Sequence, residues 1–159
     1  MAAYTLLLLV ATVGAGLNAG LFFIFSVCIM AALARLPAGE GIAAMNAINV
    51  VIQNPLFFAA FMGTALLAVA IVVLALLNGT AGSALAIGAA VLFLVGTLGV
   101  TIVFNVPMND ALAAVNPASP EGEALWKTYL GSWTAWNHVR TVTSIGSLVL
   151  FVLAYARAT

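Results

Sequence analysis

Long apolar stretches alternate with short polar ones along the chain. Four stretches rich in Ala, Leu, Val and Ile cover about residues 4–34, 55–77, 84–104 and 133–155. Each is long enough to cross the hydrocarbon core of a bilayer, which takes about 20 residues as a helix. The pattern predicts an all-α integral membrane four-helix bundle that forms a single transmembrane domain over residues 1–159.

The connection between the first two spans is expected to hold a short interfacial helix. Asn46, Asn49 and Gln53 recur at helical spacing there, which predicts one polar face. A solvated face at the membrane surface is preferred to a substrate contact. Asn54 and Pro55 then form a typical helix start, with Asn as the cap and Pro in the first turn.

The connection between the third and fourth spans is expected to hold short helices as well. Pro107 lacks a backbone donor and disfavours helical angles at Val106, so the third span should break or kink there. A new helix over residues 107–115 would place Asp110 in its first turn, where the helix dipole alone favours an acid. A second break is expected near Gly131, just before the fourth span.

Composition agrees with a membrane protein. The chain is 65% hydrophobic and 5% charged, whereas a soluble domain carries about 25% charged residues. The formal net charge is zero, so nothing indicates nucleic-acid binding. The first apolar run exceeds the roughly 7–15 residues of a signal-peptide core and is expected to remain as a helix. The bilayer is therefore a partner, and in a bacterium the location would be the cell membrane.

The last third of the chain concentrates aromatic and polar side chains on one helix face. At about 100° per residue, one stripe holds Trp126, Tyr129, Trp133, Asn137, Arg140, Ser144 and Ser147. Arg140 lies inside a span, where charges are rare and usually paired or functional. Two alternatives remain for Arg140, which are snorkelling to the interface and a structural pair with Asp110. His138 points away from the stripe unless the helix changes register near Gly131.

The first span carries its own polar group. An amide in lipid needs a partner, and an interhelical hydrogen bond is favoured over a ligand contact for Asn18. Gly16 and Gly20 form a G-x-x-x-G motif, which allows close approach of a neighbouring helix. A homo-oligomer formed through this glycine face is one interpretation.

Metal ligands are few. One His, one Cys and four acids do not provide a dedicated zinc or di-metal site. There is no second His for a haem with two imidazole ligands. No metal site and no cofactor are therefore predicted, although a haem held by one axial ligand or a loosely bound metal stays open.

Two motifs together resemble the anthrone oxygenase-like family of small four-span membrane proteins. They are Asn105-x-Pro-x-Asn109-Asp110 and Trp126-x-x-Tyr129-x-x-x-Trp133-x-x-x-Asn137-His138-x-Arg140. The resemblance covers nearly the whole chain. Fungal members are implicated in oxidising anthrones to anthraquinones with molecular oxygen and no established cofactor. The resemblance implies a membrane oxidoreductase that acts on a lipophilic phenolic or anthrone-like substrate, with molecular oxygen as co-substrate.

Such chemistry requires a base for the benzylic proton, donors for the phenolate oxygen, and aromatic walls. The candidates are His138 or Asp110 as base, Arg140 with Asn105, Asn109 and Asn137 as oxygen binders, Trp133 and Trp136 as walls, and Tyr129 and Asn18 as further substrate contacts. The alternative is a non-enzymatic membrane protein in which Arg140 and Asp110 form a structural pair, and which binds a partner or a lipid. A cavity bordered by both motifs would favour the enzyme.

Overall fold

The computed structural model describes residues 2–79 and 81–158, and these residues are helical apart from short connections. Four of the helices are long and apolar enough to cross a membrane, and they cover Ala3–Leu33, Pro55–Asn78, Ser83–Ala114 and Pro120–Ala158. The expected all-α, four-span fold is confirmed. The chain is a multi-pass membrane protein.

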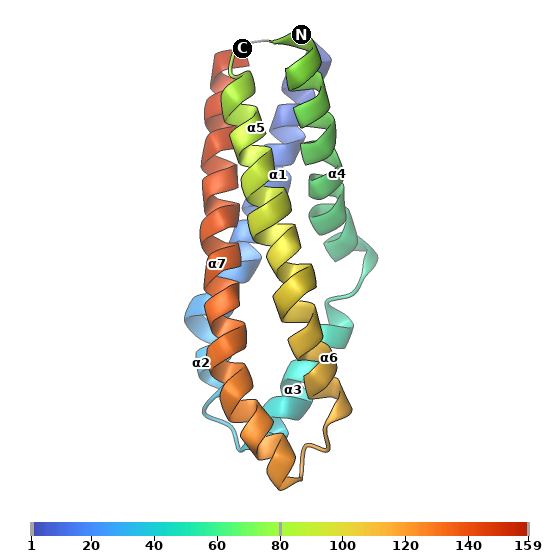
Figure 1. Ribbon diagram of the computed structural model, residues 1–159, viewed down its shortest axis with the longest axis vertical. Coiled ribbons are helices and arrows are strands. Elements are labelled where there is room, and N and C mark those ends of the chain that lie inside the picture. Colours follow the sequence, from blue (N-terminus) through green and yellow to red (C-terminus); the bar gives the residue numbers. More distant parts are fainter. Residues whose placement is uncertain (1, 80, 159) are drawn as a thin grey trace.

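The four spans form a ring of neighbouring helices (Figure 1). In this ring α1 (Ala2–Ile24) packs against α4 (Pro55–Asn78) and α7 (Pro120–Ala158). The third span begins with α5 (Ser83–Val91), which closes the ring by packing against α4 and α7. The chain ends lie together at one end of the bundle, as an even number of spans requires.

The two long connections lie at the opposite end of the bundle (Figure 1). The first span continues through η1 (Phe25–Ile29) and α2 (Met30–Leu33) and then turns into the short helix α3 (Ala38–Val51). The third span ends there as α6 (Val106–Ala114), which contacts both α3 and α7. The polar segments of both connections are therefore brought to the same end of the bundle.

The third span does not break at Pro107, so the expected break is wrong, while the alternative of a kink remains a prediction. The helix runs from Ser83 to Ala114 and widens into π-helical turns at η2 (Leu92–Gly99) and η3 (Thr101–Asn105). A proline ring clashes with the carbonyl one α-helical turn earlier and lacks an N–H, and a wider turn accommodates both defects. Lipid favours this solution, because a broken helix would leave backbone groups without water.

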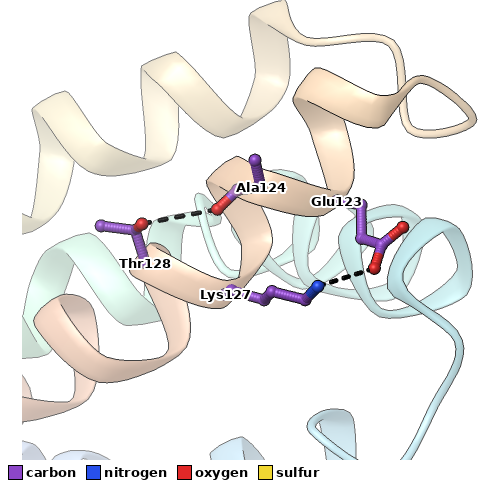
Figure 2. A network of polar contacts seen from close by, with 4 residues as sticks. All are labelled: Glu123, Ala124, Lys127 and Thr128. Atoms are coloured by element: carbon purple, nitrogen blue, oxygen red, sulfur yellow. Dashed lines mark hydrogen bonds and ion pairs between the residues drawn. The ribbon is translucent and has the colours of Figure 1, made fainter.

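The expected break near Gly131 is also wrong, since α7 is one continuous helix of 39 residues. A Cβ at Gly131 would meet nothing within 4 Å, so no neighbour forces a turn there. On the exposed side of the helix before this point, Lys127 contacts Glu123 at 2.8 Å and Thr128 Oγ1 donates to the Ala124 carbonyl (Figure 2). Both contacts join residues four apart, the spacing that supports a helix.

The start of α4 follows the sequence signal. Asn54 Oδ1 accepts from the backbone N–H groups of Leu56 and Phe57, each at 3.1 Å, and Pro55 occupies the first turn. The expected cap is confirmed. Because the cap starts α4 directly after α3, the aromatic first turns of α4 lie beside the polar end of the bundle.

The close contact of α1 occurs two residues before the G-x-x-x-G motif. A Cβ at Gly14 would collide with Thr64 Oγ1 on α4, whereas Gly16 leaves 3.6 Å to Leu148 and Gly20 meets nothing within 4 Å. Gly14 is therefore the glycine of α1 that the packing of the bundle requires. A role of the Gly16 and Gly20 face in a homo-oligomer remains a prediction.

Candidate functional site

The stripe predicted on the last helix faces the bundle interior. All seven members are buried, from Trp126 and Tyr129 at the connection end to Ser144 and Ser147 near the middle of the span. Arg140 is the one buried charged side chain among the described residues. The unbroken helix explains the agreement, because an ideal helical wheel applies along its whole length.

A cavity of about 360 Å³ lies next to this stripe, at the polar end of the ring. Its polar lining comes from four elements and consists of Asn49, Gln53, Thr101, Asn109, Asp110 and Arg140. Its aromatic lining consists of Phe22, Phe25, Phe57, Phe58, Phe61 and Trp133. The cavity thus combines a few polar groups with broad apolar walls, as small-molecule sites do.

The guanidinium of Arg140 is held between two aromatic rings. Its Cζ lies 4.4 Å from the ring centre of Phe22 and 4.9 Å from that of Trp133. Nη2 donates to Asn137 Oδ1 at 2.8 Å and Nη1 donates to Thr101 Oγ1 at 3.3 Å. Nε is buried and has no acceptor among the described residues. Since a guanidinium has five N–H donors, Arg140 retains donor capacity for a ligand.

Arg140 and Asp110 do not form a pair. The contact between Lys127 and Glu123 is the one ion pair found in residues 2–79 and 81–158. Asp110 is exposed at the edge of the cavity, whereas Arg140 is 5% exposed and lies within the bundle. A carboxylate and a guanidinium therefore border one cavity without neutralising each other.

Asn109 accepts two hydrogen bonds from α7. Tyr129 Oη and Trp133 Nε1 both donate to Asn109 Oδ1, each at 2.8 Å. Both aromatic side chains are buried, and Asn109 also lines the cavity. The two motifs of the sequence analysis therefore meet at Asn109.

Three further amides among the candidates bond to protein groups and do not line the cavity. Asn18 donates to the carbonyls of Gly14 and Ala60 and so joins α1 to α4, as the interhelical interpretation expects. Asn137 Nδ2 donates to the Phe22 carbonyl at 2.8 Å and to Ser26 Oγ at 2.7 Å.

Asn105 is buried behind the cavity wall. Its Nδ2 donates to the Trp133 carbonyl at 3.3 Å, and its Oδ1 has no donor among the described residues. Asn105, Asn18 and Asn137 position helices around the cavity, and none of the three is among its lining residues.

His138 and Trp136 lie outside the cavity. His138 is exposed, and its Nδ1 lies 2.9 Å from Ser26 Oγ on η1. Trp136 stacks on Phe104, with ring centres 3.6 Å apart. Neither residue is brought to Asp110 or Arg140, because the register change that would turn His138 inward does not occur.

Replacing His138 with alanine is expected to leave turnover within about twofold of wild type, since exposed positions away from a site shift energies by about 0.5 kcal/mol. Steady-state kinetics of the purified variant would measure this, with Val139→Ala on the same exposed face as control. A loss of about a hundredfold in His138→Ala alone would contradict the placement.

Two polar cavity residues that the sequence analysis did not assign to the site come from α3 and the turn after it. Asn49 and Gln53 line the cavity, and the neighbouring Asn46 donates to the Leu112 carbonyl of α6 at 3.3 Å. The polar face of α3 is thus turned toward α6, although a solvated face was preferred for it. The helical spacing of Asn46, Asn49 and Gln53 indicated a polar face, but it does not distinguish a solvated face from one packed against another helix.

The fold and the site define a class, that of a four-span membrane protein with a cavity between a lone carboxylate and a buried guanidinium. Within this class the chain belongs to the anthrone oxygenase family, whose model matches residues 55–150. No curated protein and no solved structure matches the chain. Family membership supports an oxygenase-type function at the level of the family.

The matched segment contains most of the residues that line the cavity. It includes Asn109, Asp110 and Arg140, whereas the walls from α1 and α3 lie before its first residue. No three His, Cys, Asp or Glu side chains of the described residues come together as a metal site would require. The absence of a cofactor remains a prediction.

Proposed function

We propose that the protein oxidises a lipophilic phenolic or anthrone-like substrate with molecular oxygen, and that Asp110 acts as the base and Arg140 binds the substrate oxygen. The observation that carries the proposal is a single cavity bordered by a carboxylate without an ion pair among the described residues and by an incompletely bonded guanidinium. His138, the other candidate base, is not part of this cavity.

The two charged groups border different parts of the cavity. Arg140 bonds to Thr101, and Asp110 follows nine residues later on the same span, which is roughly 13 Å of helix axis at 1.5 Å per residue. In an anthrone the carbonyl and the methylene occupy opposite positions of the central ring. A ligand lying along the cavity would place its oxygen at Arg140 and its acidic carbon toward Asp110.

The residues supply what the reaction needs. Asp110 takes a benzylic proton, and the electron pair left behind is delocalised onto the oxygen that Arg140 holds. Dioxygen adds to the electron-rich carbon and forms a peroxide, which is protonated. Loss of the second benzylic proton then breaks the O–O bond, so that one substrate and one dioxygen yield one quinone and one water.

The cavity also lies open on the side that a lipophilic substrate would approach. Four of its apolar lining residues are exposed on the outer surface, Phe58 and Met62 on α4 and Ile102 and Val106 on the third span. The segment of the third span that carries these residues is apolar, and lipid surrounds it. We infer that substrate passes from the bilayer between these two helices.

Placing tryptophan at Ile102 is expected to lower kcat/KM about tenfold, or about 1.4 kcal/mol, because the larger side chain would narrow the opening through which the substrate enters. Turnover in lipid nanodiscs over a range of substrate concentrations would measure this. Val95→Trp is the matched control, since Val95 is 67% exposed on the same span and does not line the cavity. Equal losses in both variants would contradict access at this opening.

The proposal is tested by measuring oxygen uptake and quinone formation by the purified protein with an anthrone. Uptake of one dioxygen per quinone above the spontaneous rate supports it, and absence of any acceleration overturns it. An absorption spectrum belongs with this experiment. A Soret band would show that haem is bound, and this would contradict the cofactor-free mechanism.

The second candidate is a non-enzymatic membrane protein with a structural polar cluster. The bonded amides favour it, because Asn18 and Asn137 each link two helices. It requires a mutually bonded cluster that includes Arg140 and Asp110. The unfilled cavity between these two residues favours the enzyme.

A further inference from the structure

The orientation of one amide in the cavity is fixed by its partners. An indole N–H only donates, so the Asn109 atom 2.8 Å from Trp133 Nε1 is the carbonyl oxygen. Tyr129 Oη donates to the same oxygen at the same distance. The Nδ2 group, with two N–H donors, is therefore directed away from α7.

The aromatic partners resist any reversal of this amide. Tyr129 and Trp133 are 2% and 4% exposed, and both pack in a cluster with Trp126 and Phe25. Turning the amide over would face its NH₂ group against the indole N–H of Trp133, which only donates, and would leave that N–H buried and unbonded. Such a loss is costly away from water, so the orientation is preorganised.

Asn109 lines the cavity beside Asp110, on α6 at the connection end of the bundle. We propose that Asn109 donates a hydrogen bond to the oxygen that dioxygen delivers to the substrate, and that Tyr129 is the positioning residue that holds Asn109. The inference rests on the proposed function, which puts the acidic carbon at this end.

The step balances without a further reactant. When the carbanion attacks dioxygen, one C–O bond forms and the electron pair moves to the outer oxygen as a peroxide anion. Asn109 Nδ2 donates to the inner oxygen, which is bonded to carbon and remains in the product, and the proton taken by Asp110 is returned to the outer oxygen. This interaction is absent in the bound substrate and arises only as charge develops, so it raises kcat more than it lowers KM.

Two ligands that differ by one oxygen test the donor without any turnover. Anthraquinone carries a carbonyl at both ends, whereas anthrone has a carbonyl at one end and a methylene at the other. Quenching of tryptophan fluorescence under anaerobic conditions would give both dissociation constants. In Asn109→Asp, which still accepts from Tyr129 and Trp133 but cannot donate as a carboxylate, anthraquinone should bind about tenfold more weakly or worse. Anthrone should change by less than about threefold.

The role of Tyr129 is tested in two backgrounds. Tyr129→Phe should weaken anthraquinone binding about threefold in the wild-type chain, because a hydrogen bond that positions Asn109 is lost. In Asn109→Leu the same replacement should have no further effect, because the residue through which Tyr129 acts is gone. A merely structural tyrosine would give the same loss in both backgrounds.

The outcomes separate the two proposals. Equal weakening of anthrone and anthraquinone in Asn109→Asp overturns the donor role, even if the protein oxidises anthrone. Selective weakening of anthraquinone in a protein that oxidises nothing supports the donor and overturns the proposed function alone. If Asn109→Asp does not fold, Asn109→Leu takes its place, since it also removes the donors and adds no charge.

Discussion

Replacing Asp110 with asparagine is expected to lower the rate of anthrone oxidation by about 10²–10⁴-fold, the usual contribution of a general base. Asp110 is the one carboxylate among the residues that line the cavity, and His138 lies outside it. Asparagine keeps the shape of the side chain and cannot accept the proton. Stopped-flow measurement of quinone formation, with the spontaneous rate subtracted, gives the effect.

The matched control for this prediction is Glu121→Gln. Glu121 is an exposed acid at the start of α7 and does not line the cavity, so its replacement should leave the rate unchanged. Thermal unfolding should be alike in the two variants and the wild type, because Asp110 is exposed and has no ion pair among the described residues. A rate in Asp110→Asn within threefold of wild type would eliminate this residue as the base.

Replacing Arg140 with methionine is expected to lower turnover by about 10²–10³-fold while the fold is retained. Loss of one donor to a developing oxyanion has a cost of this size. Stability should stay the same or rise, because a buried charge without an acid partner is replaced by an apolar side chain of similar length. Kinetics and thermal unfolding of the same preparation measure both effects.

Replacing Arg140 with lysine tests whether the positive charge is sufficient without the planar shape of the guanidinium. Arg140→Lys keeps the positive charge but loses the planar contacts with Phe22 and Trp133, so it should recover only part of the activity. The structural alternative makes the opposite prediction. If Arg140→Met unfolds the protein, or turns over like wild type once folded, Arg140 belongs to the scaffold and not to the site.

The fold and the inward face of α7 were predictable because both follow from local periodicity. Four apolar runs determine the number of spans. In a continuous helix, the rotation of about 100° per residue determines which face Arg140 lies on. Because α7 is continuous, His138 lies outside the cavity. The break near Gly131, on which a role for that histidine depended, does not form because no neighbour or buried group requires one.

The remainder of the site was not predictable because it depends on packing between distant segments. Pro107 is normally a helix breaker, and only the wider π-helical turn before it keeps Asn109 and Asp110 on the third span. The spacing of Asn49 and Gln53 fits a solvated helix face as well as one packed against another helix. Their place in the cavity follows from the docking of α3 against α6, which no local pattern encodes.

The most direct measurement of the central claim is the fate of isotopically labelled dioxygen. Purified protein in nanodiscs would be mixed with an anthrone and labelled dioxygen, and the quinone would be analysed by mass spectrometry beside Asp110→Asn and a protein-free control. The account predicts rapid formation of quinone that carries one labelled oxygen atom in wild type, and only the spontaneous rate in the variant. Quinone formation at the spontaneous rate in all three samples would contradict it.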